Sequence, residues 1–534
     1  MPKGRAMTDA LLLVTFLSIV VVLSVAARRF NIPYPISFVI GGVALAFARN
    51  LPHPHFDPDI ILLVVLPPLL YSAAWTTDAL ELRRNWRPIS LLAFGLVIFT
   101  TVIVAVVVHA LVPGFGWPVA FTLGAIVSPP DAVAAEAIFE RLSIPRRVAA
   151  IILGECLVND ATALVLYRFA VVATVSGAFS LVHAGVSFVV VAGGGALVGL
   201  ISALVLEGVL RYTRKRGLDD PTTASIVSLL APYAAYLPAE EFHFSGVLAA
   251  VTAGIVLSWR SRHFLDSEAR VQNGGVWRVL TYVLNAFAFL LIGLQLPAIL
   301  AELEPHVRDY ALYGALLAAL VIVVRLAWVF PATYLPRLLS RKLRARDPTP
   351  PWQAIFVIGW SGMRGIVSLA AALALPYTVG DQLFPERGVV IFFTVCVVFV
   401  TLVLQGLTLA PLIERLGITE SSSTHRDENR IRIVALEAGM ARLRGDLREH
   451  QGGPEMEVGG RLIEEYRHRI DVLRGKSQDD DTADAEAQID RRLECVALEA
   501  ERKAITRLRE SGQIPDDIFR SIEYDLDLAA LRLT

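Results

Sequence analysis

Cysteine and charged residues are scarce in this chain of 534 residues. Its three cysteines, Cys156, Cys396 and Cys495, are too few and too scattered for a disulfide framework, and no Cys/His spacing suggests a structural metal site. Charged residues make up only 19% of the chain, and the formal net charge of −1 gives no indication of nucleic-acid binding. These absences argue against a disulfide-stabilised, zinc-binding or nucleic-acid-binding protein.

Apolar residues, in contrast, make up 55% of the chain, and its mean hydropathy is +0.57. This composition is typical of a polytopic membrane protein. Runs long enough to cross a bilayer, roughly 17–25 residues each, predict an all-α protein with about 13 transmembrane helices, the eighth and ninth being short. They lie at 10–27, 33–49, 58–75, 88–112, 117–140, 147–175, 181–210, 222–237, 244–258, 276–300, 310–336, 352–376 and 388–413.

The Arg and Lys residues of the connections predict the orientation. Most of them follow odd-numbered spans, and the positive-inside rule places such loops in the cytoplasm. The C-terminus is then cytoplasmic and the N-terminus outside. The first span is the weakest part of this assignment, because Lys3 and Arg5 nearly balance Arg28 and Arg29, and its Ser24–Ala27 end also resembles a signal-peptidase site.

Charged residues become dominant from Thr419 onward. We therefore divide the chain into a transmembrane domain, residues 1–416, and a cytoplasmic helical tail, residues 417–534. Ser421–Thr424 is predicted to be a linker, and Asp516 to lie at the start of a last helix. The tail has no nucleotide-binding motif, and we interpret it as a packing or assembly module rather than a ligand sensor.

The segment Gly154–Asp160 places two carboxylates and an amide inside an apolar span. Ionisable groups within a membrane span are costly and usually mark an ion or proton path. On an ideal helix, Glu155 and Asp160 point about 140° apart, so they require different partners. Asn159 lies next to Asp160 and one helical turn after Glu155, so its amide is able to support either.

Two spans interrupt their own helices. Ser128–Asp131 contains two consecutive prolines in the fifth span, and Gly359–Gly365 places an arginine among three glycines in the twelfth. If spans 1–6 and 8–13 form two six-helix repeats of opposite topology, both breaks fall in the fifth member. Matched breaks in inverted repeats indicate the midplane site of a secondary transporter. A proline kink and close helix packing are the alternative explanations.

Four motifs in order carry a family resemblance: Asp131 in Ser-Pro-Pro-Asp-Ala-Val, the Glu155/Asn159/Asp160 run, Phe289–Leu296, and Gly362–Leu369. Together they resemble the monovalent cation/proton antiporters of the sodium/proton exchanger family over residues 10–415. The resemblance implies a homodimer whose two broken helices cross in a six-helix core. It also implies that Asp160 binds the cation and the proton, that Asn159 is the neutral member of an Asn-Asp pair, and that Glu155 pairs with Arg364.

The sequence departs from the family pattern at three places. Where the family usually has Thr-Asp-Pro at the first break, this chain has Pro130-Asp131-Ala132. The serine that commonly follows the family's glutamate is replaced by Cys156, and the acidic residue often found in the third span is replaced by Ser72. The predicted cation shell therefore contains Asp160, Asp131, the Asn159 amide, carbonyls freed near Pro130, and water, because hard cations prefer oxygen ligands. Cys156 and Ser72, at the positions of the departures, are two further candidate ligands. Arg325 is a second intramembrane cation, and we leave open whether it neutralises a half-helix C-terminus or another carboxylate.

A buried carboxylate that holds either a proton or a cation, but not both, explains obligatory exchange. We expect electroneutral one-for-one exchange of Na⁺ for H⁺ in a bacterial inner membrane, with Li⁺ or K⁺ as alternatives and no cofactor. The expected partners are these ions, membrane lipid and a second copy of the chain. The competing hypotheses are a cation channel and a membrane enzyme such as an intramembrane protease, which would use Asp131 and Asp160 as catalytic carboxylates. Sequence order of the four motifs favours the antiporter.

Overall fold

The computed structural model describes residues 2–30, 32–47, 61–139, 142, 144–176, 181–218, 220–261, 264–303, 307–347, 349–379, 382–418, 422–449, 454–477, 481–511 and 516–533. The chain separates into two compact units, Met1–Thr419 and Glu420–Thr534. This boundary lies within a few residues of the one proposed from charge density.

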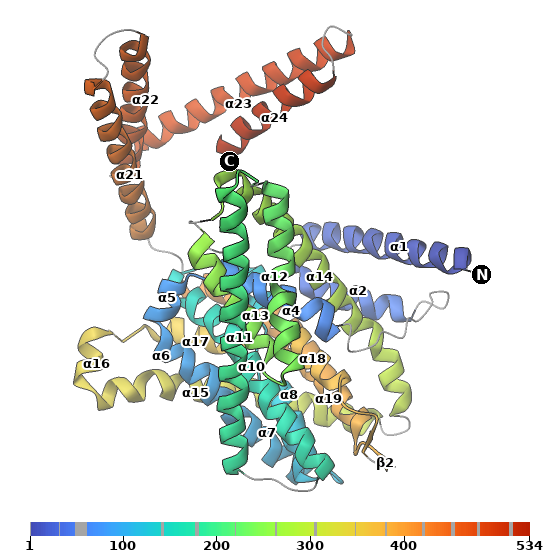
Figure 1. Ribbon diagram of the computed structural model, residues 1–534. Helices are drawn as coiled ribbons and strands as arrows, with labels where there is room; N and C mark the ends of the chain where they lie inside the picture. Colours follow the sequence, from blue (N-terminus) through green and yellow to red (C-terminus); the bar gives the residue numbers. More distant parts are fainter. Residues whose placement is uncertain are drawn as a thin grey trace. The chain divides into compact units, whose positions relative to one another are not determined.

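The first unit begins with helices and π-helical turns (labelled η) that include the fifth and sixth predicted spans (Figure 1). Their bounds are α1 Pro2–Arg29, α2 Tyr34–Ala46, η1 Ile61–Val65, α4 Leu66–Thr76, α5 Ala79–Arg84, α6 Trp86–Ser90, η2 Leu91–Leu96, α7 Val97–Leu111, α8 Trp117–Val127, α9 Ala132–Phe139 and α10 Arg146–Ser176.

The rest of the first unit is also helical except for one short β-hairpin. Its elements are α11 Leu181–Lys215, α12 Pro221–Glu241, α13 Gly246–Arg260, α14 Ser267–Glu302, α15 Val307–Leu339, α16 Arg341–Arg346, α17 Trp352–Trp360, α18 Ile366–Leu373, β1 Thr378–Val379, β2 Gln382–Leu383, α19 Arg387–Val400, η4 Thr401–Gln405 and α20 Gly406–Leu416. The antiparallel pair β1–β2 lies between the last two predicted spans and was not expected.

All thirteen predicted spans overlap helical segments. Within the described residues, seven helices are long and apolar enough to cross a membrane, and three further apolar helices are shorter. The chain is therefore a helical, multi-pass membrane protein. The number of crossings and the inverted repeats stay predictions.

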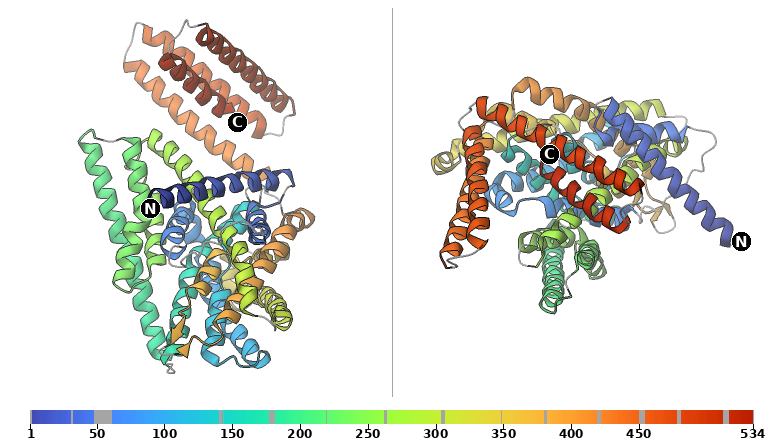
Figure 2. Two further views of the ribbon diagram at one scale, coloured as in Figure 1. Left: turned by 90° about the vertical axis from the view of Figure 1, so that its right-hand side faces the viewer. Right: turned by 90° about the horizontal axis from the view of Figure 1, so that it is seen from above.

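Local sequence explains where many of these helices begin. The Asp220 carboxylate accepts a hydrogen bond from Thr223 N at 2.9 Å before α12, and Asp266 does the same for Ala269 N at 2.7 Å before α14. Helix α2 packs closely against α14 because both present glycine: a Cβ on Gly42 would lie 2.3 Å from Leu290 O. Helices α11, α12 and α13 lie side by side in all views (Figure 2).

The second unit consists of α21 Ser422–Glu449, α22 Pro454–Ser477, α23 Asp481–Glu510 and α24 Asp516–Leu533. Helices α21 and α22 pair through ion pairs such as Arg474–Glu437 at 2.7 Å, and α23 pairs with α24, where Arg502 contacts Asp527. The expected helix start at Asp516 is confirmed. The predicted linker is wrong in part, because Ser422–Thr424 already belong to the first turn of α21.

Candidate functional site

The two helix breaks meet at Asp131. Its backbone N–H donates to Met363 O at 2.7 Å. Its carboxylate accepts from Val133 N at 2.8 Å through Oδ1 and from Ile366 N at 3.1 Å through Oδ2. Asp131 therefore caps the N-termini of both downstream half-helices, α9 and α18, where a negative charge is favourable.

This crossing requires glycine at position 365. A Cβ on Gly365 would lie 1.5 Å from Asp131 Oδ2, so any larger residue would displace the carboxylate. On the other side of the break, Pro129 and Pro130 have no N–H to donate and leave nearby carbonyls available. The Asn159 side chain uses one of these, because its Nδ2 donates to Pro130 O at 2.9 Å.

The prediction that Glu155 pairs with Arg364 is wrong. Arg364 is fully buried, and its guanidinium donates to backbone carbonyls: Nε to Val127 O at 3.1 Å, Nη2 to Ser128 O at 3.4 Å, and Nη1 to Gly362 O. Val127 and Ser128 end the first half of the broken helix, where carbonyls lack intrahelical donors. Arg364 therefore neutralises a half-helix C-terminus and not a carboxylate.

Glu155 instead forms a two-point ion pair with Arg325 of α15. Arg325 Nη1 donates to Oε1 at 2.6 Å and Nη2 to Oε2 at 2.8 Å, and both side chains are inaccessible to solvent. Arg325 also donates to Ile358 O from Nε at 3.3 Å and from Nη2 at 3.1 Å. Because Ile358 lies in the last turn of α17, both roles left open for Arg325 are realised at once.

The buried arginines thus lie at half-helix C-termini, and the Asp131 carboxylate lies at half-helix N-termini. Arg364 lies at the C-terminus of α8 and Arg325 at that of α17, whereas Asp131 lies at the N-termini of α9 and α18. This distribution opposes the helix dipoles at each break. The charges of Glu155 and Asp131 are thus compensated by groups of the protein itself, and both residues have a structural role.

Asp160 is in a different position. Its side chain is buried, with 6% of the residue exposed, on the same helix as Glu155. Within the described part of the chain, it has no hydrogen-bond or ion-pair partner, and its charge interacts with that of Asp131. Beside it, the Asn159 side-chain oxygen is also buried without a partner. Asp160 and Asn159 thus provide acceptor oxygens that the protein itself leaves unsatisfied.

Cys156 and Ser72, the other two predicted ligands, are placed differently. Cys156 is a buried free thiol on α10, among the charges of Glu155, Asp160, Asp131 and Arg325. Ser72 lines a cavity of about 900 Å³, together with Ala132 and Val133 just after the first break. Ser72 therefore lines a cavity that reaches the residues next to Asp131, and no described contact joins it to the side-chain oxygens of Asn159 or Asp160.

The same cavity contains charged groups that the sequence did not single out. Glu136 of α9 and the basic residues Arg28, Arg270 and Arg278 line it, and all belong to the side predicted to be cytoplasmic. At the other end of α10, Arg168 forms an ion pair with Glu240 of α12 at 2.7 Å. The cavity thus reaches the first turn of α9, next to Asp131, while an ion pair joins α10 to α12 toward the other end of α10.

Sequence reasoning also missed two polar residues of the thirteenth span. Thr401 and Gln405 are fully buried in η4. The Thr401 hydroxyl accepts from Arg364 N at 3.1 Å and so supports the second break, while neither polar side-chain atom of Gln405 has a hydrogen-bond partner among the described residues. The available signal was two polar residues, one helical turn apart, in an otherwise apolar run.

This arrangement suits a proton or a single hard cation better than a catalytic reaction or a multidentate metal. No cluster of three His, Cys, Asp or Glu side chains suited to a metal occurs among the described residues. A buried carboxylate without a counter-charge is stabilised when a proton or a cation neutralises it. The adjacent amide and carbonyl oxygens are the ligands that hard cations prefer.

Comparison with known proteins gives concordant matches. Residues 13–415 match the family model described as sodium/hydrogen exchanger, transmembrane. The chain is 32% identical to an uncharacterized Na⁺/H⁺ exchanger, YjcE, of Escherichia coli K12, over 96% of this chain and 97% of that protein. It is 31% identical to the sodium, potassium, lithium and rubidium/H⁺ antiporter of Bacillus pumilus, over 85% of this chain and 69% of that protein. The fold is similar to that of the antiporter MjNhaP1 of Methanocaldococcus jannaschii, with a TM-score of 0.59 at 19% identity over 77% of this chain and 99% of that one.

Proposed function

Because the chain belongs to the sodium/hydrogen exchanger family, we propose that it exchanges Na⁺ for H⁺, one for one, with Asp160 as the group that holds either ion. Membership makes it a membrane antiporter of monovalent cations and protons. The choice of Na⁺, the one-for-one stoichiometry and the role of Asp160 go beyond family membership. The observation on which it rests is that Asp160 is the one carboxylate of this site without a partner among the described residues.

The exchange mechanism follows from the missing counter-charge at Asp160. With neither ion bound, the Asp160 anion is buried without a counter-charge, which is costly in a low-dielectric surrounding. A proton or a monovalent cation removes this cost, and the two compete for the same oxygens. If only the neutralised forms reorient across the membrane, each cation moved in one direction is matched by a proton moved in the other.

The remaining ligands of the cation are proposed from the groups near Asp160. In the described part of the chain, the Asn159 side-chain oxygen has no hydrogen-bond partner, and the amide is oriented by its bond to Pro130 O. Water from the cavity completes the shell. Asp131, Cys156 and Ser72 then have supporting roles: Asp131 holds the two half-helices, Cys156 packs beside the charges, and Ser72 lines the entry cavity.

Exchange of K⁺ or Li⁺ by the same mechanism is the second candidate, supported by the similarity to the Bacillus pumilus antiporter named for four alkali cations. A cation channel is disfavoured, because Arg168–Glu240 joins α10 to α12 at the end opposite the large cavity, and both residues line a small cavity of about 80 Å³ there. We further propose a homodimer in a bacterial inner membrane, with the tail in the cytoplasm.

The test is cation-driven proton movement in proteoliposomes with a trapped pH dye. Na⁺, Li⁺, K⁺ and choline are added separately to wild-type protein, Asp160→Asn and Glu241→Gln. Glu241 is an exposed carboxylate at the end of α12 and serves as the control for charge removal. We expect Na⁺ to drive proton movement in the wild type and the control, and no cation to do so in Asp160→Asn. Wild-type rates in Asp160→Asn would refute the assignment.

A further inference from the structure

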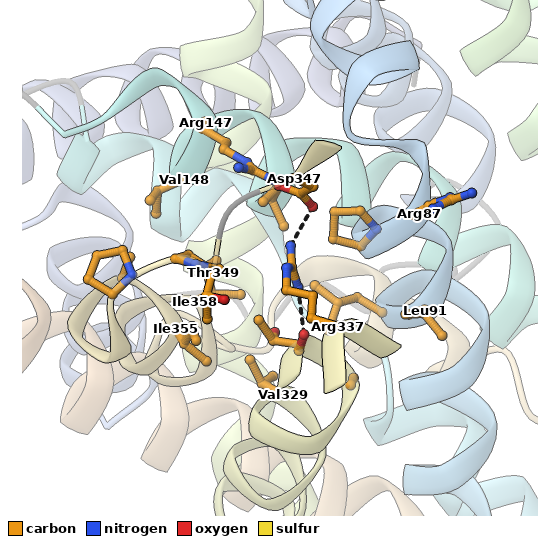
Figure 3. A pocket seen from close by; sticks show the side chains of 18 of the residues that line it. Arg87, Leu91, Arg147, Val148, Val329, Arg337, Asp347, Thr349, Ile355 and Ile358 are labelled. Atoms are coloured by element: carbon orange, nitrogen blue, oxygen red, sulfur yellow. Dashed lines mark hydrogen bonds and ion pairs between the residues drawn. The ribbon is translucent and has the colours of Figure 1, made fainter. Parts of the chain in front are cut away.

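A second, larger cavity lies away from Asp160. Its volume is about 1100 Å³, and it is lined by α6, η2, the start of α10, the end of α15, the α16–α17 connection and the end of α20. Figure 3 shows this pocket from close by. Its described lining is mainly apolar, with Leu91, Val148, Val329, Ile355 and Ile358 among the contributors.

Arginines give the pocket an excess of positive charge. Arg147 Nη2 and Arg337 Nη2 both donate to the Asp347 carboxylate, at 2.6 Å and 2.5 Å, and Arg87 lines the pocket elsewhere (Figure 3). The described lining therefore contains three guanidinium groups and one carboxylate, which pairs with two of them. Arg337 is only 8% exposed, and its Nε is buried with no hydrogen-bond partner in the part of the chain that the structure describes. An anionic group in the pocket would balance this charge.

The pocket also lies where a lipid headgroup would lie. Trp86 lines it and Trp352 stands next to its lining residue Pro351, and these two side chains are 58% and 53% exposed, as in the aromatic belts at membrane interfaces. On its η2 wall, Leu91 and Phe94 are each 38% exposed, so this wall presents apolar surface outward. The pocket thus combines a positive end with an apolar wall.

We propose that this pocket binds one anionic phospholipid, with its phosphate at Arg147 and Arg337 and an acyl chain along η2 and α15. A phosphate accepts hydrogen bonds from guanidinium groups, and the apolar wall accommodates hydrocarbon that a free anion lacks. In the orientation proposed above, this end faces the cytoplasm, so the lipid comes from the inner leaflet. The lining includes Ile358, whose carbonyl binds Arg325, and Leu416–Ile418, the last residues of the membrane unit. The bound lipid therefore contacts both the support of the Glu155–Arg325 pair and the start of the connection to the tail.

The test measures lipid binding to the full chain in detergent. Delipidated protein is titrated with phosphatidylglycerol, phosphatidylcholine, glycerol 3-phosphate or inorganic phosphate, and bound lipid is counted by native mass spectrometry while the thermal midpoint is recorded. We expect one tightly bound phosphatidylglycerol that raises the midpoint, with the other three ligands about tenfold weaker or more. Equal binding of phosphatidylcholine would overturn the anionic specificity. Equal binding of glycerol 3-phosphate or phosphate would overturn the lipid assignment in favour of a simple anion site.

Two variants with opposite expected effects keep the test decisive. Arg147→Gln removes one phosphate donor and should weaken phosphatidylglycerol binding about tenfold. Asp347→Asn removes the competing carboxylate and should strengthen it, which a merely structural defect would not do. Arg83→Gln, an exposed arginine outside the pocket lining, is the matched control and should bind like the wild type. Weaker binding in Asp347→Asn, or equal losses in Arg147→Gln and Arg83→Gln, would contradict the proposal.

Discussion

The two carboxylates of α10, Glu155 and Asp160, differ in whether the protein provides a counter-charge. Glu155 is held by two short bonds from Arg325, and both side chains are inaccessible to solvent. Asp160, little more than one turn away, is also buried but has no such partner among the described residues. The same residue chemistry on the same helix thus serves structure in one region and is left available in the other. The presence of a built-in counter-charge, rather than burial, distinguishes the two.

The comparison extends to the helix breaks. Asp131 is half-buried and Asp160 is buried, and the two oxygens of Asp131 accept backbone N–H groups from two half-helices. Its charge is therefore compensated by helix N-termini. Of the three carboxylates Asp131, Glu155 and Asp160 at this site, the first two are compensated by the protein, and the third is left for an external cation or proton.

The largest expected effect on stability comes from removing one partner of the Glu155–Arg325 ion pair. Glu155→Gln or Arg325→Met should each lower the free energy of unfolding by about 3–5 kcal/mol, because the remaining partner stays buried and unpaired. Replacing both, Glu155→Leu with Arg325→Met, should recover most of the loss. Thermal unfolding in detergent measures all three variants.

A surface pair in the same chain supplies the control for these measurements. Arg84 Nη1 lies 2.9 Å from Glu81 Oε1, but the side chains of Arg84 and Glu81 are 64% and 30% exposed. Arg84→Met should therefore cost less than about 1 kcal/mol. Strictly additive losses at Glu155 and Arg325 would show that their contact is not the source of stability.

The next effect concerns the role of Asp131 as a cap. Asparagine keeps one oxygen that can cap a helix, but its amide nitrogen cannot accept from the second N–H, and it lacks the charge that favours the two half-helix N-termini. Asp131→Asn should therefore lose about 1–2 kcal/mol of stability and still exchange, whereas Asp131→Ala should lose more stability and most activity. Thermal unfolding and exchange assays are run on the same samples. Loss of exchange in a fully stable Asp131→Asn protein would assign Asp131 to ion binding instead.

A smaller effect is expected at Asn159. Asn159→Ala removes the bond to Pro130 O and should cost about 1 kcal/mol, and it should also raise the Na⁺ concentration needed for half-maximal exchange. Asn85→Ala is the matched control, because the buried Asn85 amide donates to Glu81 O at 3.0 Å, away from the site. The control should lose similar stability without a change in Na⁺ dependence. Identical Na⁺ dependence in Asn159→Ala would remove the amide from the cation shell.

The smallest effect on transport should come from deleting the tail. Every group of the proposed site lies in the unit Met1–Thr419. Protein ending at Thr419 should therefore exchange at close to the full-length rate, with changes confined to its pH profile or dimer stability. Reconstituted full-length and shortened proteins are compared at equal amounts. A correctly inserted but inactive short form would show that the tail takes part in the mechanism.

Much of the helical layout could be predicted because it depends on local composition. Apolar runs locate the helices, and the Pro129-Pro130 pair and the glycines around Arg364 locate the breaks. The contact between the breaks was expected from the family resemblance, and the bond from Asp131 N to Met363 O agrees with it. The short hairpin β1–β2 has no comparable local signal, because each strand contains only two residues.

The pairing of buried charges could not be predicted in the same way. Arg325 and Arg364 are both single arginines in apolar surroundings, and the sequence does not reveal which helix face turns toward Glu155. Arg364 lies in irregular backbone, where free carbonyls satisfy it, while Arg325 lies within a regular helix and reaches both Ile358 O and the carboxylate. Tertiary placement decides between them.

The most direct test of the account is the effect of membrane potential on exchange. If Asp160 is the one carboxylate that cycles, each cation is exchanged for one proton and no net charge moves. Proteoliposomes are given a K⁺ gradient with or without valinomycin, so that the same ions are present with and without an imposed potential, and Na⁺-driven proton movement is recorded. We predict equal rates in both conditions. A clear dependence on potential would contradict the account, because one net charge per cycle adds about 2.3 kcal/mol per 100 mV, and would indicate a second cycling group, with Asp131 the first candidate.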